Sequence, residues 1–291
     1  MRILILGGDG MLGHKLLQHF QSAHSARVTL RQDLTAYEHF ALFNPRNAYA
    51  GVDVRSSDRI QEVLADFRPE VVINAIGIVK QRAEAKESIP SLEINALFPH
   101  RLAVMCKAVG ARLIHMSTDC VFSGRKGHYT EHDSSDAEDL YGRTKFLGEL
   151  YEPYCITLRT SIIGRELSRK SGLVEWFLAQ KGGRCRGFSR ALFSGLTTQA
   201  LAEVMTDLIE KYPRISGLYH VSGEPIQKYD LLQLMNEIYR LGVTVERDDD
   251  FVYDRCLDST RFRQGTGWRP KPWRAMIEQM AGDPTPYGSW G

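Results

Sequence analysis

The stretch that decides the fold is RILIL (residues 2–6), followed at once by GGDGMLG (residues 7–13). The first segment is a short apolar run of the kind that forms a buried strand, and residues 11–20 repeat apolar side chains with the period of an amphipathic helix. Between them the glycines are spaced G-x-x-G-x-x-G. Glycine is needed where such a turn is tight, where the backbone approaches a pyrophosphate and where helix packs on strand. Since a helix N-terminus also offers free N–H groups to phosphate, we expect a dinucleotide here.

The rest of the first half alternates short apolar or β-branched runs with helical patterns, which is typical of βαβ units around a parallel sheet. The expected strands are 2–6, 26–30, 71–74, 112–116 and 155–159, and the expected helices are 11–20, 57–67, 91–109 and 140–151. After about residue 160 this rhythm weakens. We therefore predict an α/β fold with two parts: a Rossmann-type, doubly wound parallel sheet over residues 1–160, and a smaller C-terminal α/β substrate-binding lobe over residues 161–291, from which some segments return to the first domain.

Composition and charge narrow the class of protein. Of 291 residues, 43% are hydrophobic and 25% are charged, which is ordinary for a globular protein. The 37 Lys and Arg residues against 35 Asp and Glu give a net charge of +2, so no global field favours nucleic acid or an anionic membrane as partner. We expect neither a signal peptide nor a membrane span, because no apolar run approaches about 20 residues. Five scattered cysteines without a CxxC pair favour a reducing cytoplasm.

The end of the second predicted strand bears on which dinucleotide is bound. Arg31 stands where an arginine accommodates the 2′-phosphate of NADP, and where an acidic residue would instead bind the ribose of NAD. Asp33 follows two residues later and is either a turn residue or a competing ribose ligand. The pattern favours NADPH, with NADH as the alternative.

Tyr141 and Lys145 are four positions apart in a helical pattern and therefore share one helix face. A tyrosine hydroxyl donates a proton to a developing alkoxide more readily when its pKa, near 10 in water, is lowered, and a neighbouring ammonium has this effect. Thr118 directly follows the predicted strand 112–116, at the edge of the sheet where α/β proteins bind ligands. It is placed to hydrogen-bond the same carbonyl oxygen that Tyr141 would protonate. Together the three residues predict a carbonyl-reducing site.

Residues 165–190 carry a local excess of positive charge, with seven basic residues against two acidic ones. The basic residues are Arg165, Arg169, Lys170, Lys181, Arg184, Arg186 and Arg190. The stretch is either a solvated loop and helix face or a cationic wall for an anionic substrate. Nucleic acid is disfavoured because no recognisable binding module accompanies the charge.

A series of short motifs extends along the whole chain. They are GGDGMLG (7–13), Asp53-Val54, VVINAIG (71–77), STDCVFSG (117–124), YGRTKFLGE (141–149), LRTSIIG (158–164), GLYHVSGE (217–224), LDSTRF (257–262) and TGWRP (266–270). In this order and at these separations they resemble the extended short-chain dehydrogenases/reductases and, within them, the dTDP-4-dehydrorhamnose reductase group. The likeness covers essentially the whole chain and is more specific than any one motif.

The resemblance implies an NADPH-dependent reduction of the 4-keto group on a nucleotide-activated 6-deoxy sugar. Tyr141 would be the general acid, Lys145 would lower its pKa and hold the nicotinamide ribose, and Thr118 would orient the carbonyl. Cofactor contacts would come from Gly7, Gly10, Met11, Leu12 and Gly13 at the pyrophosphate, Arg31 at the ribose, Asp53 and Val54 at the adenine, and Asn74, Ala75, Ile76 and Gly77 at the middle of the molecule. Asp119 would lie near the sugar, while Arg261 and residues 165–190 would face its diphosphate, for which arginine is the natural fork.

The sequence departs from that group at the sugar site. The group usually reads STDYVF, whereas residue 120 is Cys, and it usually carries Trp within the segment where this chain has Ile162 and Ile163. These departures concern the identity of the sugar and not the reduction itself.

Two other functions share the same motifs. The methionine adenosyltransferase β subunit resembles this reductase group and regulates a partner enzyme, so an NADP-binding regulatory subunit is one alternative, although the intact Thr118, Tyr141 and Lys145 favour catalysis. A nucleotide-sugar epimerase is the other, and Arg31 argues against it because epimerases generally keep NAD and an acidic residue on the second strand. We predict no metal site, and the sequence leaves the oligomeric state, a homodimer included, open.

Overall fold

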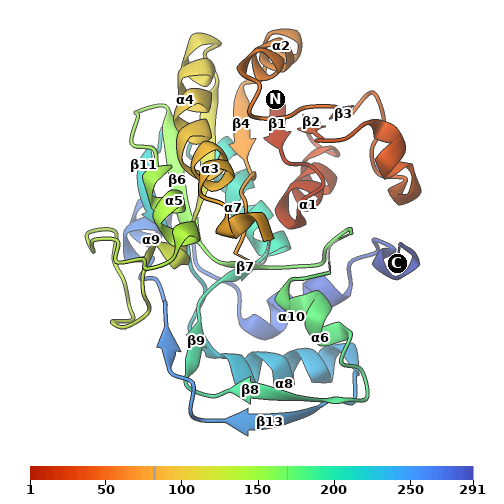
Figure 1. Cartoon of the computed structure of the whole chain (residues 1–291), viewed down its shortest axis with the longest axis vertical. Coiled ribbons are helices and arrows are strands. Elements are labelled where there is room, and N and C mark those ends of the chain that lie inside the picture. The colour runs from red at the N-terminus through yellow and green to blue at the C-terminus, as the bar shows by residue number, and fades with distance from the viewer. Residues whose placement is uncertain (81–82, 169, 291) are drawn as a thin grey trace.

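The computed structural model describes residues 1–80, 83–168 and 170–290, so Arg169 of the basic stretch lies outside the described residues. Within them, the central sheet has the strand order β11-β6-β5-β4-β1-β2-β3 (Figure 1), and neighbouring strands pair in parallel. Its strands are β1 (Arg2–Leu6), β2 (Ser25–Thr29), β3 (Ala48–Tyr49), β4 (Val71–Asn74), β5 (Arg112–Thr118), β6 (Cys155–Thr160) and β11 (Gly217–His220). This is the doubly wound Rossmann arrangement, and it confirms the predicted fold class.

The chain reverses its progress across the sheet between β1 and β4. From β1 it moves through β2 to β3 at one edge, and from β4 it moves through β5 and β6 to β11 at the other. In open α/β sheets, ligands bind outside the carboxyl ends of the strands at such a switch point. The turns after β1, β2 and β4 therefore surround the expected binding position.

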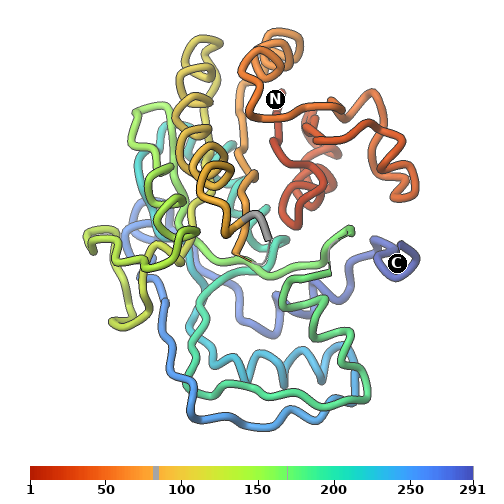
Figure 2. Tube along the Cα trace, in the orientation of Figure 1, coloured from red at the N-terminus to blue at the C-terminus, as the bar shows by residue number. Residues whose placement is uncertain are grey.

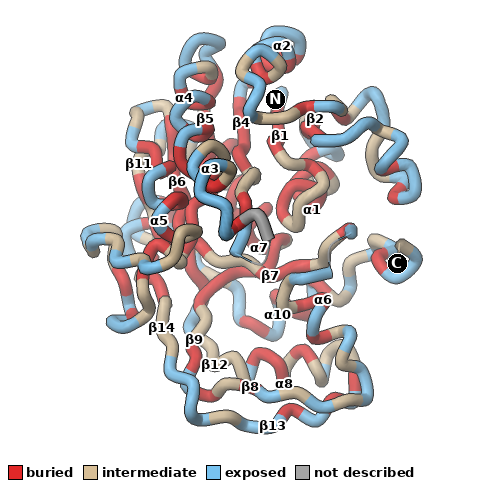
Figure 3. Tube along the Cα trace, in the orientation of Figure 1, coloured by how far each residue is buried: buried red, intermediate tan, exposed pale blue. Residues whose placement is uncertain are grey.

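Helices cover both faces of the sheet. Ile3 and Ile5 of β1 belong to one core with α1 (Met11–Phe20) and α7 (Thr198–Glu210), whereas Leu4 and Leu6 belong to the other with α2 (Ser57–Phe67) and α4 (Phe98–Ala108). Successive side chains of a strand point to opposite faces, so burial on both faces requires a continuous apolar run. Figure 3 shows the buried residues concentrated along these central strands.

Two expected helices differ from the observed ones. The pattern at 91–109 is divided into α3 (Ser88–Ser91), the π-helical segment η3 (Leu92–Leu97) and α4, and the pattern at 140–151 ends earlier, as α5 (Leu140–Leu147). The two changes meet at one contact, because a Cβ on Gly148 would lie 2.0 Å from the Asn95 carbonyl oxygen. The Asn95 side chain is turned inward, accepting from the Ile78 N–H (2.9 Å) and donating to the Ile78 carbonyl (3.0 Å).

The chain beyond residue 160 contributes to both parts of the molecule. α7 packs on α1 and β11 pairs with β6, so the segment around residues 198–220 returns to the sheet. The remaining elements build the lobe seen below the sheet in Figure 1: β7 (Ile162–Ile163), α6 (Leu173–Leu178), β8 (Arg184–Phe188), β9 (Ala191–Phe193), β10 (Leu196–Thr197), β12 (Ile226–Gln227), α8 (Lys228–Tyr239), β13 (Thr244–Asp248), β14 (Tyr253–Asp254) and α10 (Trp273–Ala281).

The last elements return toward the first domain. α9 (Thr260–Thr266) contacts β11, and η5 (Tyr287–Ser289) lies near the start of the chain, where Tyr287 hydrogen-bonds His14 (2.8 Å). Figure 2 shows this C-terminal segment beside the N-terminal part of the fold, where the rings of Trp290 and Phe40 lie 5.2 Å apart. Among the described residues, no helix has both the length and the apolar character needed to cross a bilayer.

Candidate active site

The glycine turn after β1 is a backbone cradle with no room for side chains. Gly7 has a φ of +87°, a conformation that favours glycine. A Cβ on Gly13 would lie 1.9 Å from the Gly7 carbonyl oxygen, and one on Gly8 would lie 2.5 Å from Val28. Helix α1 begins directly after Gly10, which makes no side-chain cap, so its first N–H groups are available to a ligand. The cradle fits the pyrophosphate of a dinucleotide.

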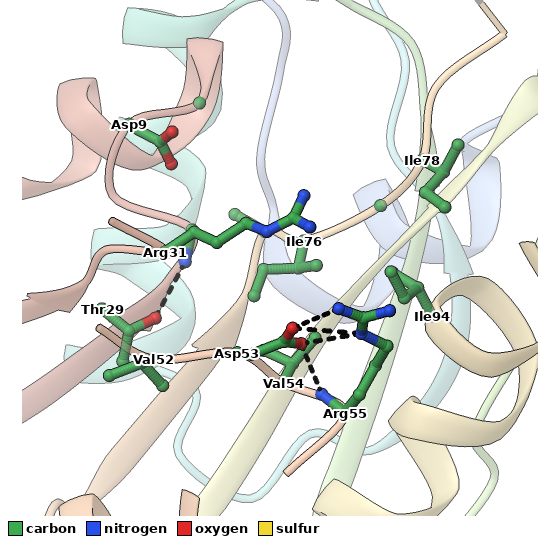
Figure 4. Close-up of a pocket in the computed structure, with 14 residues that line it drawn as sticks. Asp9, Thr29, Arg31, Val52, Asp53, Val54, Arg55, Ile76, Ile78 and Ile94 are labelled. Atoms are coloured by element: carbon green, nitrogen blue, oxygen red, sulfur yellow. Dashed lines mark hydrogen bonds and ion pairs between the residues drawn. The ribbon is translucent and has the colours of Figure 1, made fainter. Parts of the chain in front are cut away.

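A pocket opens from this cradle along the ends of β1, β2 and β4 (Figure 4). Of the residues predicted to contact a cofactor, those that line it are Gly7, Gly10, Arg31, Asp53, Val54, Ala75, Ile76 and Gly77. Met11, Leu12 and Gly13 form the first turn of α1 behind the cradle. Asn74 is buried beneath the pocket, where its side-chain oxygen accepts from the Ile76 N–H (3.2 Å).

Six further residues line the pocket that the motifs do not single out: Asp9, Thr29, Val52, Arg55, Ile78 and Ile94. Most of them stand within a few residues of a strand end or of a predicted contact, so the sheet topology is the signal that could have found them. Ile94 comes from η3, which the topology of the sheet alone does not place.

Two arginines bring positive charge to this pocket. Figure 4 shows the guanidinium groups of Arg31 and Arg55 reaching into it from different segments. Arg55 donates to the Asp53 carboxylate, with Nε 3.1 Å from either oxygen, and this interaction lowers the pKa of Asp53 to about 2. Arg31 acts on Asp53 in the same direction through charge. An anionic group such as a ribose phosphate suits this environment.

Tyr141, Lys145 and Thr118 meet where β5 ends. Asp139 caps α5 by accepting from the Gly142 N–H (2.8 Å), so the first turn of the helix begins at the carboxyl edge of the sheet. Lys145 is buried, and its Nζ donates to the Met116 carbonyl of β5 (2.6 Å). The side chain of Thr118 is close enough to Tyr141 to lower the pKa of its hydroxyl, so the strand end lies beside the helix.

The buried surroundings shift the pKa values of both helix residues. Burial raises the pKa of the Tyr141 hydroxyl, the nearby Cys120 thiol adds to the rise, and the Thr118 side chain opposes it. Burial lowers the pKa of the Lys145 ammonium to about 8, against the attraction of the Glu149 carboxylate. Tyr141 therefore holds its proton at neutral pH, and the charge on Lys145 changes just above it.

A buried ion pair supports this group from below. Glu149 accepts from Arg159 at both oxygens (2.7 Å each) and from the Ser117 hydroxyl (2.7 Å). The Arg159 guanidinium lies 5.1 Å from the Phe122 ring centre. Because Ser117 precedes Thr118 and Glu149 follows α5, the pair holds β5, β6 and the helix in register. The motifs predicted no role for Glu149 or Arg159, although the two residues lie within YGRTKFLGE and LRTSIIG.

The residues expected around the sugar are only partly brought together. Asp119 accepts from the Thr118 hydroxyl (3.1 Å) and so lies at the site. Arg261 does not reach it: this residue is exposed on α9, and its guanidinium lies 4.7 Å from the centre of the Tyr219 ring on the outer strand β11. The Arg261 side chain lies on the face of α9 that packs on the edge of the sheet. Its position in the motif LDSTRF did not indicate this orientation.

Three of the six described basic residues in the stretch 165–190 form ion pairs with acidic residues of the lobe. Arg165 pairs with Glu175 (2.6 Å). Arg184 and Arg186 lie on β8 and pair with Glu246 (3.5 Å) and Asp248 (3.2 Å) of the neighbouring strand β13. In Figure 1, β8 and β13 form the outer side of the lobe, away from α5. Among the described residues, no group of three or more His, Cys, Asp or Glu is arranged to hold a metal ion.

The parallel sheet, the glycine cradle and the Tyr141–Lys145 pair beside it define a Rossmann-fold protein of the extended short-chain dehydrogenase/reductase type. The chain belongs to the family described as the RmlD substrate binding domain, whose model matches residues 1–241.

Comparison with known proteins gives the same family. The chain is 24% identical over 310 residues to the dTDP-4-dehydrorhamnose reductase of Aggregatibacter actinomycetemcomitans, covering 96% of this chain and 98% of the relative. It is 26% identical over 258 residues to methionine adenosyltransferase 2 subunit beta of Rattus norvegicus, covering 82% of this chain and 72% of the relative.

Two solved structures illustrate the likeness of fold. A hypothetical dTDP-4-dehydrorhamnose reductase from Sulfolobus tokodaii superimposes with a TM-score of 0.76 at 26% identity, covering 94% of this chain and 98% of the other. The dTDP-4-dehydrorhamnose reductase of Bacillus anthracis, solved in complex with NADP, gives a TM-score of 0.75 at 20% identity, covering 96% and 98%.

Proposed function

We propose that the protein is an oxidoreductase that uses NADPH to reduce the 4-keto group of a nucleotide-activated 6-deoxy sugar. The observation that carries the proposal is the meeting of Tyr141, Lys145 and Thr118 at the end of β5, one strand away from the pocket at β4 and β1. The relatives named as dTDP-4-dehydrorhamnose reductases support this reaction class. The five free cysteines support a cytoplasmic location.

The residues present divide the work of a ketone reduction. Bound NADPH supplies the hydride that adds to the carbonyl carbon. Thr118 and Tyr141 hold the carbonyl oxygen, and Tyr141 gives it a proton as the new alcohol forms. Lys145, in its ammonium form, would stabilise the phenolate left on Tyr141 and would hold the ribose next to the nicotinamide. Asp119 lies beside Thr118 and would contact the sugar.

The pocket suits NADPH better than NADH. Arg31 would pair with the 2′-phosphate, Asp53 and Val54 would contact the adenine, and the glycine cradle would hold the pyrophosphate. The NADP complex of the Bacillus anthracis relative supports this choice. NADH remains the alternative cofactor, since the cradle contacts only what both molecules share.

The test is NADPH oxidation at 340 nm with dTDP-, UDP- and GDP-linked 4-keto-6-deoxy sugars. We expect turnover with one nucleotide class and its loss in Tyr141→Phe. Tyr154→Phe is the matched control, because Tyr154 is the loop residue directly before β6, away from Thr118. Tight NADPH binding without turnover of any of these sugars would contradict the proposal.

A second candidate is an NADP-binding regulatory subunit. It is favoured by the relative named methionine adenosyltransferase 2 subunit beta, which matches 82% of this chain. This function predicts that the protein changes the activity of a methionine adenosyltransferase catalytic subunit and that Tyr141→Phe leaves the effect intact. A nucleotide-sugar epimerase, by contrast, would convert its substrate without net NADPH consumption.

We also propose a homodimer and a substrate-binding role for the lobe within residues 161–291. Large exposed apolar side chains support the first, among them Ile89 (72% exposed), Val104 (68%) and Leu147 (56%) on α3, α4 and α5. Light scattering after gel filtration tests the dimer. Substitutions of the lobe residues Lys228 and Arg255 test whether the lobe binds substrate.

A further inference from the structure

Two positively charged side chains of the lobe, Lys228 and Arg255, lie near the group formed by Thr118, Tyr141 and Lys145. Lys228 is the first residue of α8, and Arg255 follows β14. Both lie over the same aromatic ring, since Arg255 is 4.6 Å and Lys228 is 5.9 Å from the centre of the Tyr253 ring. Such cation–π contacts hold the two side chains in one place without neutralising them.

The two cations and the Tyr253 ring lie close to the end of β5. The Asp254 N–H donates to the Gly124 carbonyl (3.1 Å), so β14 lies beside the loop that follows Thr118. Arg255, Tyr253 and Asp139 line one pocket together with Lys80, Ser123 and Glu138. Arg255 and Lys228 both act electrostatically on Asp119, the neighbour of Thr118.

Neither cation forms an ion pair with a residue that the structure describes. In the part of the chain that the structure describes, the side chains of Lys228 and Arg255 form no ion pair, and Arg255 Nε is buried without a hydrogen-bond acceptor. Some other cations of the lobe are paired, for example Arg274 with Glu237 (2.8 Å) and Arg186 with Asp248 (3.2 Å). Lys80, at the rim of the pocket, pairs with Asp139 (2.7 Å).

Such an arrangement is costly unless an anion completes it. The buried Arg255 Nε has lost its hydration without gaining an acceptor, whereas Lys228 and Arg255 as whole residues are only partly buried. Burial lowers the pKa of Lys228, and the Asp119 carboxylate opposes that shift. Asp119 attracts both cations but lies outside ion-pair distance of either, so its carboxylate does not satisfy Arg255 Nε.

We propose that Lys228 and Arg255 bind an anionic group of the substrate close to the carbon that is reduced. The group is one that the sugar ring itself carries, either the phosphate at its anomeric carbon or a carboxylate on the ring. Both present paired oxygens to a guanidinium fork and an ammonium. The inference rests on the proposed function, because it takes the site at Thr118 and Tyr141 as the place of the sugar.

The experiment measures binding calorimetrically, without turnover, for the NADP-loaded protein. The variants are Arg255→Gln and Lys228→Gln, with Arg184→Gln as the matched control, because Arg184 is an exposed lobe arginine on the outer strand β8. The probes are dTDP, UDP and GDP, and the pair UDP-glucuronate and UDP-glucose, which differ by one carboxylate. We expect an affinity loss of about 10- to 100-fold per variant, the size of a lost charge-assisted hydrogen bond.

The probes distinguish the two sources of the anion. Loss of affinity for a nucleoside diphosphate assigns the phosphate, whereas loss for UDP-glucuronate but not for UDP-glucose assigns a ring carboxylate. Affinities that match those of Arg184→Gln for every probe, or no binding of any probe by the unmodified protein, overturn the inference. Arg255→Lys keeps the charge and should recover part of the affinity, and thermal unfolding checks that each variant is folded.

Failure of the inference and failure of the proposed function are separable. If the variants bind normally while the unmodified protein oxidises NADPH with a keto sugar, the anion site is wrong and the reductase stands. If the variants lose binding while no keto sugar is reduced, the anion site stands and the reductase is wrong.

Discussion

The rate of reduction is expected to follow the charge on Lys145. Burial lowers the pKa of this ammonium from its ordinary 10.5 to about 8, with the Glu149 carboxylate opposing the shift. The ammonium is the form that stabilises a phenolate on Tyr141, so activity is present below the folded-state pKa and is lost as pH rises through it. Burial raises the pKa of Tyr141, so its hydroxyl keeps its proton over the same range.

The size of the effect follows from a single titrating group. With a pKa of about 8, roughly one tenth of the Lys145 side chains carry a proton at pH 9, and roughly one hundredth at pH 10. The activity is therefore expected to fall about tenfold for each pH unit above 8 and to be flat on the acid side down to about pH 6.

The assay is kcat/KM for the keto sugar at saturating NADPH, from about pH 6 to pH 10, because this parameter reports groups of the enzyme before the sugar binds. Lys145→Arg is the control. Its guanidinium stays charged throughout, so this slower variant should lose the descending limb. Activity that is independent of pH up to 10, or the same limb in Lys145→Arg, would refute the reasoning.

Three further predictions concern the supports of the site. Glu149→Gln is expected to lower the free energy of unfolding by about 3–5 kcal/mol in urea titrations, because Arg159 is left buried without its carboxylate; a change below about 1 kcal/mol would contradict this. Gly13→Ala should abolish NADPH binding measured by fluorescence, since its Cβ would lie 1.9 Å from a backbone oxygen, whereas Gly265→Ala, with its nearest atom at 3.7 Å, should leave binding unchanged. Arg31→Ala should weaken NADPH binding by about 10- to 100-fold and NADH binding little, and an equal loss for both cofactors would remove the assignment to the 2′-phosphate.

The elements of the first domain were predictable because their signals are local. β1 and β4 match the expected strands, and α1 and α2 match the expected helices. The helix expected over residues 91–109 was wrong in its continuity. Apolar periodicity does not reveal that Asn95 turns inward to bond Ile78 or that Gly148 packs on the Asn95 carbonyl.

Within the site, the sequence predicted which residues share a helix face or a strand end, but it did not predict where the side chains of the lobe lie. Tyr141 and Lys145 share a helix face because they are four residues apart, and the strand-end position of Thr118 follows from sheet topology. Arg261 lies in a family motif, yet the packing of α9 on β11 turns it to Tyr219. Charge counting alone could not tell that β13 carries the acidic partners of β8.

The sequence by itself determined the Rossmann sheet, the glycine cradle and the helix face that Tyr141 and Lys145 share, because each depends on the order of residues within one short segment or on one strand–turn–helix unit. Only the tertiary structure decided which cations of the lobe face the candidate site. Lys228 and Arg255 are separated from Thr118 by most of a domain and carry no local motif. The backbone hydrogen bond between Asp254 and Gly124 is a long-range contact, and contacts of this kind bring the two cations close to Asp119.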